Sequence, residues 1–202
     1  MTNAPTPLHR PSTVLGDDGR MRCSWSGTDP EYRRYHDDEW GYPLHGDRPL
    51  FEKISLEAFQ AGLSWITILK RRPAFREAFA NFEIDAVAAL TDNDIERLMA
   101  DTRIIRNRQK IVATRQNARI TLDLVGDSPG ALDDLVWSFA PAPGPRPESF
   151  GDIAPVTPES TALSARLRGL GFRFVGPTTM YALMQSSGMV DDHVVGCWRA
   201  QD

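Results

Sequence analysis

The sequence predicts a single all-α domain, and three observations support this fold class. The chain has 202 residues, which is enough for one domain with a sizeable core. From residue 49 onward, large apolar residues recur at helical spacing, and the alternation typical of β-strands is hard to find. A glycine-rich segment over residues 167–179 joins two helical stretches as a tight hairpin. We therefore expect helices linked mainly by short connections.

The composition agrees with a globular protein and excludes other classes. Hydrophobic residues make up 41% of the chain and charged residues 25%, which excludes a wholly disordered chain. No apolar run approaches the roughly 18 residues that span a bilayer, so we expect no membrane association and a cytoplasmic protein. With 23 basic and 27 acidic side chains, the formal net charge is −4. Contact with nucleic acid would therefore require a local basic face.

Two parts of the chain are expected to lie outside the regular helices. Residues 1–21 contain three prolines and few large apolar residues, which predicts a flexible N-terminal tail before a helical domain over residues 22–202. Six prolines predict an irregular surface loop over residues 140–158. We expect neither segment to touch the site residues described below.

The spacing of apolar residues places several helices in order along the chain. One follows residue 49, a second includes residues 75–79, and a third begins with a start signal at residues 91–92. The longest runs from about Arg103 to Gly126, and helix is expected to resume near Ser160. The residues that carry this spacing are Leu50, Phe51, Ile54, Ala58, Phe59, Phe75, Phe79, Ile95, Leu98, Met99, Ile104, Ile111, Ala118, Leu122 and Val125.

Each of the two cysteines has a histidine companion. Cys23 precedes His36 by 13 residues, and His193 precedes Cys197 by four. Four residues are one helical turn, so a helix would place His193 and Cys197 on the same face. Two sulfur and two nitrogen donors suit tetrahedral zinc, which with four protein ligands would be structural and would fasten the N-terminal segment to a C-terminal helix. The alternative is two buried free thiols and histidines with ordinary roles.

Two segments without acidic residues are candidates for binding DNA phosphates. In the hairpin, Gly176 can adopt an unusual backbone conformation, and Pro177 suits the first position of a helix. The N–H groups of the next turn would then be free for a phosphate, with Arg173, Thr178 and Thr179 nearby. The alternative is an ordinary helical turn beside a solvated face. The second segment, in the longest predicted helix, has six basic residues: Arg103, Arg106, Arg108, Lys110, Arg115 and Arg119.

Aromatic residues are concentrated between residues 23 and 65, which hold eight of the chain's 18. Aromatic rings are the surfaces on which a flipped nucleobase stacks. Glu57 shares a largely apolar side of its predicted helix with Ile54 and Ala61, so its carboxylate is expected to be at least partly buried. Two roles remain open for Glu57: a salt bridge or peripheral position, or an acceptor for a cationic ligand.

Four ordered segments spread over residues 22–198 resemble the 3-methyladenine DNA glycosylase I family. They are residues 22–25 (RCSW), 35–41 (YHDDEWG), 57–67 (EAFQAGLSWIT) and 192–197 (DHVVGC). The resemblance implies a helix-hairpin-helix glycosylase with a structural zinc ion. It also implies base-excision repair, in which 3-methyladenine is released from alkylated double-stranded DNA by monofunctional hydrolysis and an abasic site remains.

The resemblance further assigns roles to residues at the matching positions. Glu57 and Tyr35 would make the polar contacts to the base, and Trp65 would stack on it. Trp25 and Trp40 would form further aromatic walls. Excision would depend on Glu57, which selects the cationic base. The implied zinc ligands are Cys23, His36, His193 and Cys197.

Gly62 and Leu63, beside the predicted pocket, are candidates for the wedge that fills the gap left by a flipped nucleotide. The expected partners are alkylated DNA and the free 3-methyladenine product, and the protein is expected to act as a monomer. None of the three lysines lies near the hairpin in sequence, which disfavours Schiff-base chemistry. Two other classes remain: a lesion-binding protein without turnover, disfavoured by the intact pocket residues, and a small-molecule zinc hydrolase, disfavoured by four protein ligands.

Overall fold

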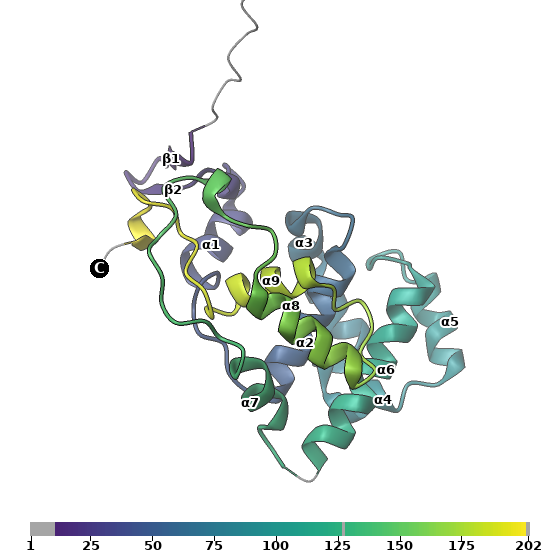
Figure 1. Cartoon of the computed structure of the whole chain (residues 1–202). Coiled ribbons are helices and arrows are strands. Elements are labelled where there is room, and N and C mark those ends of the chain that lie inside the picture. Colours follow the sequence, from purple (N-terminus) through teal and green to yellow (C-terminus); the bar gives the residue numbers. More distant parts are fainter. Residues whose placement is uncertain (1–10, 127, 201–202) are drawn as a thin grey trace, which may run out of the picture.

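The computed structural model describes residues 11–126 and 128–200, and this part of the chain is mostly helical, as predicted. Within it, no helix is both long enough and apolar enough to cross a bilayer. Figure 1 shows the helices packed around α2, with the N-terminal strands beside the C-terminal segment. The strands are β1 (Thr13–Leu15) and β2 (Met21–Cys23). The α-helices are α1 (Pro30–Asp38), α2 (Asp47–Gln60), α3 (Trp65–Ala78), α4 (Ile84–Ala88), α5 (Asp92–Ala100), α6 (Arg108–Gly126), α7 (Ala131–Trp137), α8 (Pro158–Gly169) and α9 (Pro177–Ser186), and the 3-10 helices are η1 (Ser24–Ser26), η2 (Ala80–Phe82), η3 (Phe150–Asp152) and η4 (Trp198–Ala200).

Helix α2 is buried along most of its length. Every residue from 50 to 59 is buried, and α2 contacts α3, α6, α7 and α9. A surface helix buries only one apolar stripe, whereas a helix surrounded by others must bury its polar residues as well. The charged residues of this buried stretch, Glu52, Lys53 and Glu57, therefore need partners or a cavity inside the protein.

A buried lysine fixes the C-terminal end of α2. Lys110 Nζ donates to the carbonyl oxygens of Phe59, at 2.9 Å, and Ala61, at 2.7 Å. Carbonyl groups at the end of a helix have no N–H partner within the helix, and lysine is a common donor to them. Helix α6, which carries Lys110, begins at Arg108, so the predicted start near Arg103 is five residues too early.

Helices α8 and α9 form the predicted hairpin. Gly171, with φ of +98°, and Phe174, with φ of +58°, adopt the left-handed conformation in the turn. Gly176 has an extended backbone with φ of −65°, so the predicted unusual conformation at this glycine is wrong. The side chain of Asn117 in α6 accepts from Arg173 N at 2.9 Å and donates to Arg173 O at 3.1 Å. One buried amide thus fastens the turn to α6.

The N-terminal segment differs from the prediction of a flexible tail over residues 1–21. β1 pairs antiparallel with β2, with Thr13 opposite Cys23 and Leu15 opposite Met21. Residues 11–21 are therefore part of a β-hairpin that leads directly into the cysteine, and residues 1–10 lie outside the described part. Strands of three residues are too short for their alternation to be visible in the sequence.

We expect Lys110→Met to lower the free energy of unfolding by about 2 kcal/mol, because it leaves the carbonyl oxygens at the end of α2, including that of the buried Phe59, without their donor. Arg106→Met removes the same charge from an exposed position and is the matched control, with an expected change within about 0.5 kcal/mol. Urea unfolding followed by tryptophan fluorescence measures both. A loss in Lys110→Met no larger than in the control would contradict the capping role.

Candidate functional site

A cavity of about 210 Å³ is lined by all five residues predicted for the pocket. Trp25 lies in η1, Tyr35 on α1 and Trp40 shortly after α1, whereas Glu57 is on α2 and Trp65 begins α3. These residues come from four successive parts of the chain and converge because α1 and α2 both pack against α3 and η1 packs against α1. The structure thus brings the five residues together at one cavity.

The aromatic rings of the cavity are in contact with one another. The ring centroids of Trp25 and Trp40 are 5.0 Å apart with an interplanar angle of 73°, an edge-to-face arrangement. Tyr35 and Trp65 are 5.4 Å apart and tilted by 45°. Trp25 also lies 6.4 Å from Tyr35. The four side chains thus form a connected wall that a flat, apolar ligand can stack on.

Glu57 places a carboxyl group in this aromatic surrounding. Only 3% of the residue is exposed, and Ser186 Oγ of α9 donates to its Oε1 at 3.1 Å. Burial raises the pKa of Glu57 to about 7, although the positive charge of Lys53 and the Ser186 hydrogen bond act in the opposite direction. Burial, reinforced by Glu57, also raises the pKa of Tyr35, whose hydroxyl therefore stays neutral. A peripheral position is excluded, because Glu57 is buried and lines the cavity from the core.

The proline-rich connection contributes two pocket residues that the sequence analysis missed. Phe150 of η3 and Ile153 line the cavity, so the expectation that this segment touches no site residue is wrong. The segment is held in place partly by a backbone hydrogen bond of 2.9 Å from Val195 N to Pro147 O. The large apolar residues Phe150 and Ile153, within this proline-rich stretch, were the signal that could have revealed this contact.

Helix α9 supplies further polar groups, also missed. Gln185 and Ser186 both line the cavity. Gln185 Nε2 donates to Asp192 Oδ2 at 2.7 Å, and the same oxygen accepts the Tyr181 hydroxyl at 2.7 Å. Because a carboxylate only accepts hydrogen bonds, the Gln185 amide nitrogen is committed to Asp192, and the amide oxygen is the end left for other donors.

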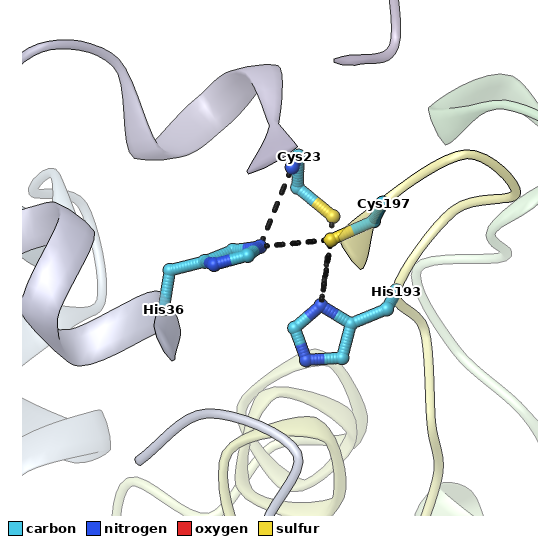
Figure 2. A group of neighbouring side chains, drawn as sticks. All are labelled: Cys23, His36, His193 and Cys197. Atoms are coloured by element: carbon cyan, nitrogen blue, oxygen red, sulfur yellow. Dashed lines mark hydrogen bonds between the residues drawn. The ribbon is translucent and has the colours of Figure 1, made fainter. Parts of the chain in front are cut away.

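The two cysteines and their histidines meet at one point, as Figure 2 shows for Cys23, His36, His193 and Cys197. All four are buried, and their donor atoms lie within 4.8 Å of one another. Cys197 Sγ is 3.4 Å from His36 Nε2 and 3.6 Å from His193 Nδ1, and Cys23 Sγ is 3.7 Å from His193 Nδ1. Tetrahedral zinc, with bonds of about 2.3 Å to sulfur and 2.0–2.1 Å to nitrogen, holds such atoms about 3.5 Å apart. The donor set therefore fits zinc.

Both histidines are oriented by hydrogen bonds from the ring nitrogen that points away from the cluster. His36 Nδ1 lies 2.8 Å from Asp37 Oδ1, and His193 Nε2 donates to the carbonyl oxygen of Trp40 at 3.2 Å. Such outer contacts select the tautomer whose free lone pair faces the ligand site. Because Trp40 is also a wall of the cavity, the cluster and the pocket share a structural element.

The predicted helix through His193 and Cys197 is absent. Residues 193–197 instead form a turn, closed by a hydrogen bond of 3.0 Å from Cys197 N to Val194 O, with Gly196 at φ of +87°. The turn brings the two ligands as close together as a helical turn would have done. The spacing of four was therefore informative although the inferred element was wrong.

The residues predicted to contact DNA lie outside the pocket. Gly62 and Leu63 are exposed in the turn between α2 and α3, with the pocket residues Gln60 and Trp65 on either side in the chain. Gly62 has φ of +85°, a conformation that favours glycine. This turn therefore projects at the edge of the cavity.

The hairpin residues Arg173, Gly176, Thr178 and Thr179 lie in and after the turn between α8 and α9. Arg173 and Thr178 are exposed, whereas Gly176 and Thr179 are partly exposed. The start of α9 has Pro177 at its first position and no side-chain cap. The N–H groups of its first turn are consequently available to a ligand.

The predicted basic face of α6 is mostly occupied by internal contacts. Its cations reach acidic side chains or carbonyl oxygens of neighbouring elements, and Lys110 is buried. These contacts join Arg103 to Glu77 and Asp101, Arg108 to Glu96, Arg115 to Asp92 and Leu90 O, and Arg119 to Ala88 O. The stretch therefore stabilises the packing of α4 and α5 against α6 and is not a free anion-binding surface.

The raised pKa of Glu57 predicts that burial of its carboxyl group lowers the free energy of unfolding by an amount that depends on pH. Between about pH 4.5 and 7, the unfolded chain has released this proton and the folded chain retains it, so stability falls as pH rises. We expect Glu57→Gln to be more stable than the original protein by up to about 3 kcal/mol above pH 8, and equal to it near pH 4. Urea unfolding across this range tests the prediction; a constant difference at all pH values would refute it.

Comparisons with known proteins agree on one family. A family model described as methyladenine glycosylase matches residues 25–200. The DNA-3-methyladenine glycosylase 1 of Escherichia coli is 46% identical over 181 residues, which cover 87% of this chain and 95% of that protein. The DNA-3-methyladenine glycosylase of Haemophilus influenzae is 42% identical and covers 87% of this chain and 96% of its own length.

Solved structures lead to the same family. A crystal structure of 3-methyladenine DNA glycosylase I superposes with a TM-score of 0.84 at 45% identity, and the match covers 88% of this chain and 98% of the other. The enzyme from Staphylococcus aureus, studied for its recognition of 3-methyladenine, gives a TM-score of 0.83 at 35% identity over 90% and 97% of the two chains. Sequence and fold agree, and the chain belongs to the methyladenine glycosylase family.

Proposed function

We propose that this protein hydrolyses the N-glycosidic bond of 3-methyladenine in alkylated double-stranded DNA and leaves an abasic site. The observation that carries the proposal is the buried carboxyl group of Glu57 in a cavity walled by aromatic rings. The family relatives are named for this activity, and a solved structure of the family contains 3-methyladenine. The proposal therefore rests on the pocket chemistry and on the family together.

The substrate needs little chemical activation. Methylation at N3 makes the adenine cationic, so the base is already a good leaving group. When the glycosidic bond breaks, its electron pair neutralises the base, and a water oxygen forms the new bond to the sugar carbon while its proton goes to solvent. The main task of the protein is then to extract the base from the duplex and hold it near the geometry of departure.

Glu57 selects the cationic base. A positive ring placed beside the carboxyl group lowers the pKa of Glu57 from its value of about 7 in the empty pocket, so the carboxylate is ionised in the complex. Trp65 stacks on the ring, whose positive charge is also attracted to an aromatic face. Tyr35, neutral because of its raised pKa, supplies a hydroxyl to the polar edge of the base. A neutral adenine gains none of the charge-dependent part of this binding.

The exposed groups around the pocket serve DNA. Leu63, with 40% of its surface exposed, and Gly62 form the wedge that replaces the extruded nucleotide. The start of α9 at Thr178 and Thr179 binds a backbone phosphate through free N–H groups, aided by the exposed Arg173. Because the basic residues of α6 are mostly paired internally, we assign the phosphate contacts to this hairpin.

Schiff-base chemistry has no suitable lysine among the residues that line the described cavity. Lys110 donates to two carbonyl oxygens, and Lys70 pairs with Asp29 at 2.5 Å. Lys53 lies near the rings of Tyr35 and Trp65 but does not line the cavity. We therefore propose a monofunctional hydrolase that does not cleave the DNA backbone.

We further propose a structural zinc ion at the four-residue cluster of Figure 2. Four protein ligands leave no open position for water, so the ion would take no part in the hydrolysis. It would tie the segment that carries Trp25 and Trp40 to the C-terminal turn, and thereby keep two walls of the pocket in place. We also propose that the protein acts as a monomer.

The proposed reaction is tested with DNA treated with a methylating agent, from which released bases are separated by chromatography. We expect 3-methyladenine to be released in preference to 7-methylguanine, and Glu57→Gln to reduce the rate by about 100-fold or more, because the ionic contact to the base is lost. The variant keeps the size of the side chain and an acceptor for Ser186. No release by the folded protein would favour a binding protein without turnover, and strand cleavage above that of abasic DNA alone would contradict monofunctional hydrolysis.

The proposed zinc is tested by elemental analysis and by thermal unfolding with and without a strong chelator. We expect one zinc per chain and a melting temperature lowered by about 10 °C or more after its removal, because four buried donor groups lose their shared partner. His193→Ala should have a lowered melting temperature that the chelator does not change further. His45→Ala, at an exposed histidine, is the control and should behave like the original protein. Protein that contains no metal yet melts at the same temperature would refute the assignment.

A further inference from the structure

Lys53 is an unusual residue for the centre of a buried helix. Only 8% of it is exposed, and it lies one helical turn before Glu57 on α2. Among the residues that the structure describes, no carboxylate oxygen lies within 4.0 Å of its ammonium group. A lysine buried without a direct partner is costly, because desolvation disfavours its charge. Such a residue calls for a functional explanation.

The ammonium group lies against the aromatic wall. Lys53 Nζ is 5.1 Å from the ring centroid of Tyr35 and 5.4 Å from that of Trp65, within the range of cation–π attraction. Both rings line the base pocket, whereas Lys53 lines a neighbouring cavity of about 410 Å³. This second cavity is also lined by Leu56 of α2 and Ser186 of α9. The cation is therefore behind the wall and does not compete with a bound base for the pocket.

The other acids near Lys53 already have cationic partners, so the charges of Lys53 and Glu57 act mainly on each other. On the lysine side, Glu39 is held by Arg72, and Glu52 by Arg76 at 2.7 Å, so both nearby acids already have a cation. On the glutamate side, the titratable groups whose charges interact with the carboxyl group are the neutral Tyr32 and Tyr35 of α1 and Lys53 of α2 itself, and Ser186 of α9 donates a hydrogen bond to it. Lys53 is the cation that acts on Glu57.

We propose that Lys53 is a positioning residue for charge, whose ammonium group, behind the aromatic wall, favours the ionised form of the Glu57 side chain in the empty pocket. This inference rests on the proposed function, in which the ionised carboxylate receives the cationic base. The two charges are one helical turn apart in a poorly solvated region, where their interaction is much stronger than in water. The aromatic wall separates the ammonium group of Lys53 from the bound base. The ammonium group can therefore stabilise the Glu57 carboxylate while that carboxylate still contacts the base.

The consequence is an extended pH range for excision. Burial raises the pKa of Glu57, the positive charge of Lys53 and the Ser186 hydrogen bond lower it, and the net value is about 7. Without that charge, the fraction of empty pockets that hold a carboxylate would fall at neutral pH. The effect would disappear at high pH, where Glu57 is ionised in either case.

The test is the pH dependence of kcat/KM for release of 3-methyladenine, which reports ionisations of the free enzyme. For Lys53→Met, which keeps most of the length of the side chain, we expect the acidic limb of the kcat/KM profile to move to higher pH by about one unit. Excision would then fall about tenfold at pH 6 and stay within twofold at pH 9.5. Lys70→Met is the control, because Lys70 pairs with Asp29, has a side chain that is 57% exposed and does not line the pocket. The acidic limb of the pH profile should not move in this variant.

A direct measurement separates this inference from the proposed activity. The carboxyl resonance of Glu57, identified by its loss in Glu57→Gln, is titrated by carbon-13 NMR in the absence of DNA. We expect its midpoint to rise by about one unit in Lys53→Met and to be unchanged in Lys70→Met. Equal midpoints in Lys53→Met and the original protein, or an equal loss of excision at all pH values, would overturn the role of Lys53. An original protein that releases no base, but whose Glu57 midpoint depends on Lys53, would refute only the proposed activity.

Discussion

The burial of α2 on all sides is the constraint on which the rest of this structure depends. Its ten consecutive buried residues include two glutamates and a lysine, and each must be compensated inside the protein. Glu52 is compensated by Arg76. Glu57 has a single hydroxyl partner and a cavity, and Lys53 has two ring faces. The site is thus the place where the packing of a central helix leaves a charge incompletely compensated, and in the proposed function the cationic base completes the compensation.

Much of the site was predictable because its residues lie in short segments with distinctive composition. The helical spacing around Glu57 placed it on an apolar face, and the density of aromatic residues near it indicated a stacking pocket. The paired cysteines and histidines predicted a common cluster even though the turn at residues 193–197 was taken for a helix. Local chemistry was sufficient in these cases, because the donor atoms or rings had few other ways to be buried.

The remaining features depend on contacts between distant parts of the chain. Phe150 reaches the pocket only because the proline-rich connection crosses the N-terminal segment, and no local pattern specifies that path. The basic face of α6 was predicted because its own stretch of sequence has no acidic residue. The acids that pair with its cations, such as Asp92 and Glu96, lie on α5. The hairpin of β1 and β2 has too few residues for a periodic signal. In each case tertiary packing, and not local propensity, decides the outcome.

The cluster of Cys23, His36, His193 and Cys197 also has a consequence for the order of events during synthesis. Cys23 and His193 are 170 residues apart in the chain, and Trp40, a wall of the pocket, accepts a hydrogen bond from His193. A growing chain that has not yet reached residue 197 has no complete cluster, and one wall of its pocket lacks this support. Contacts of such long separation form late in folding. The cluster, and the contact that it makes with Trp40, can therefore be complete only on chains that have been synthesised through Cys197.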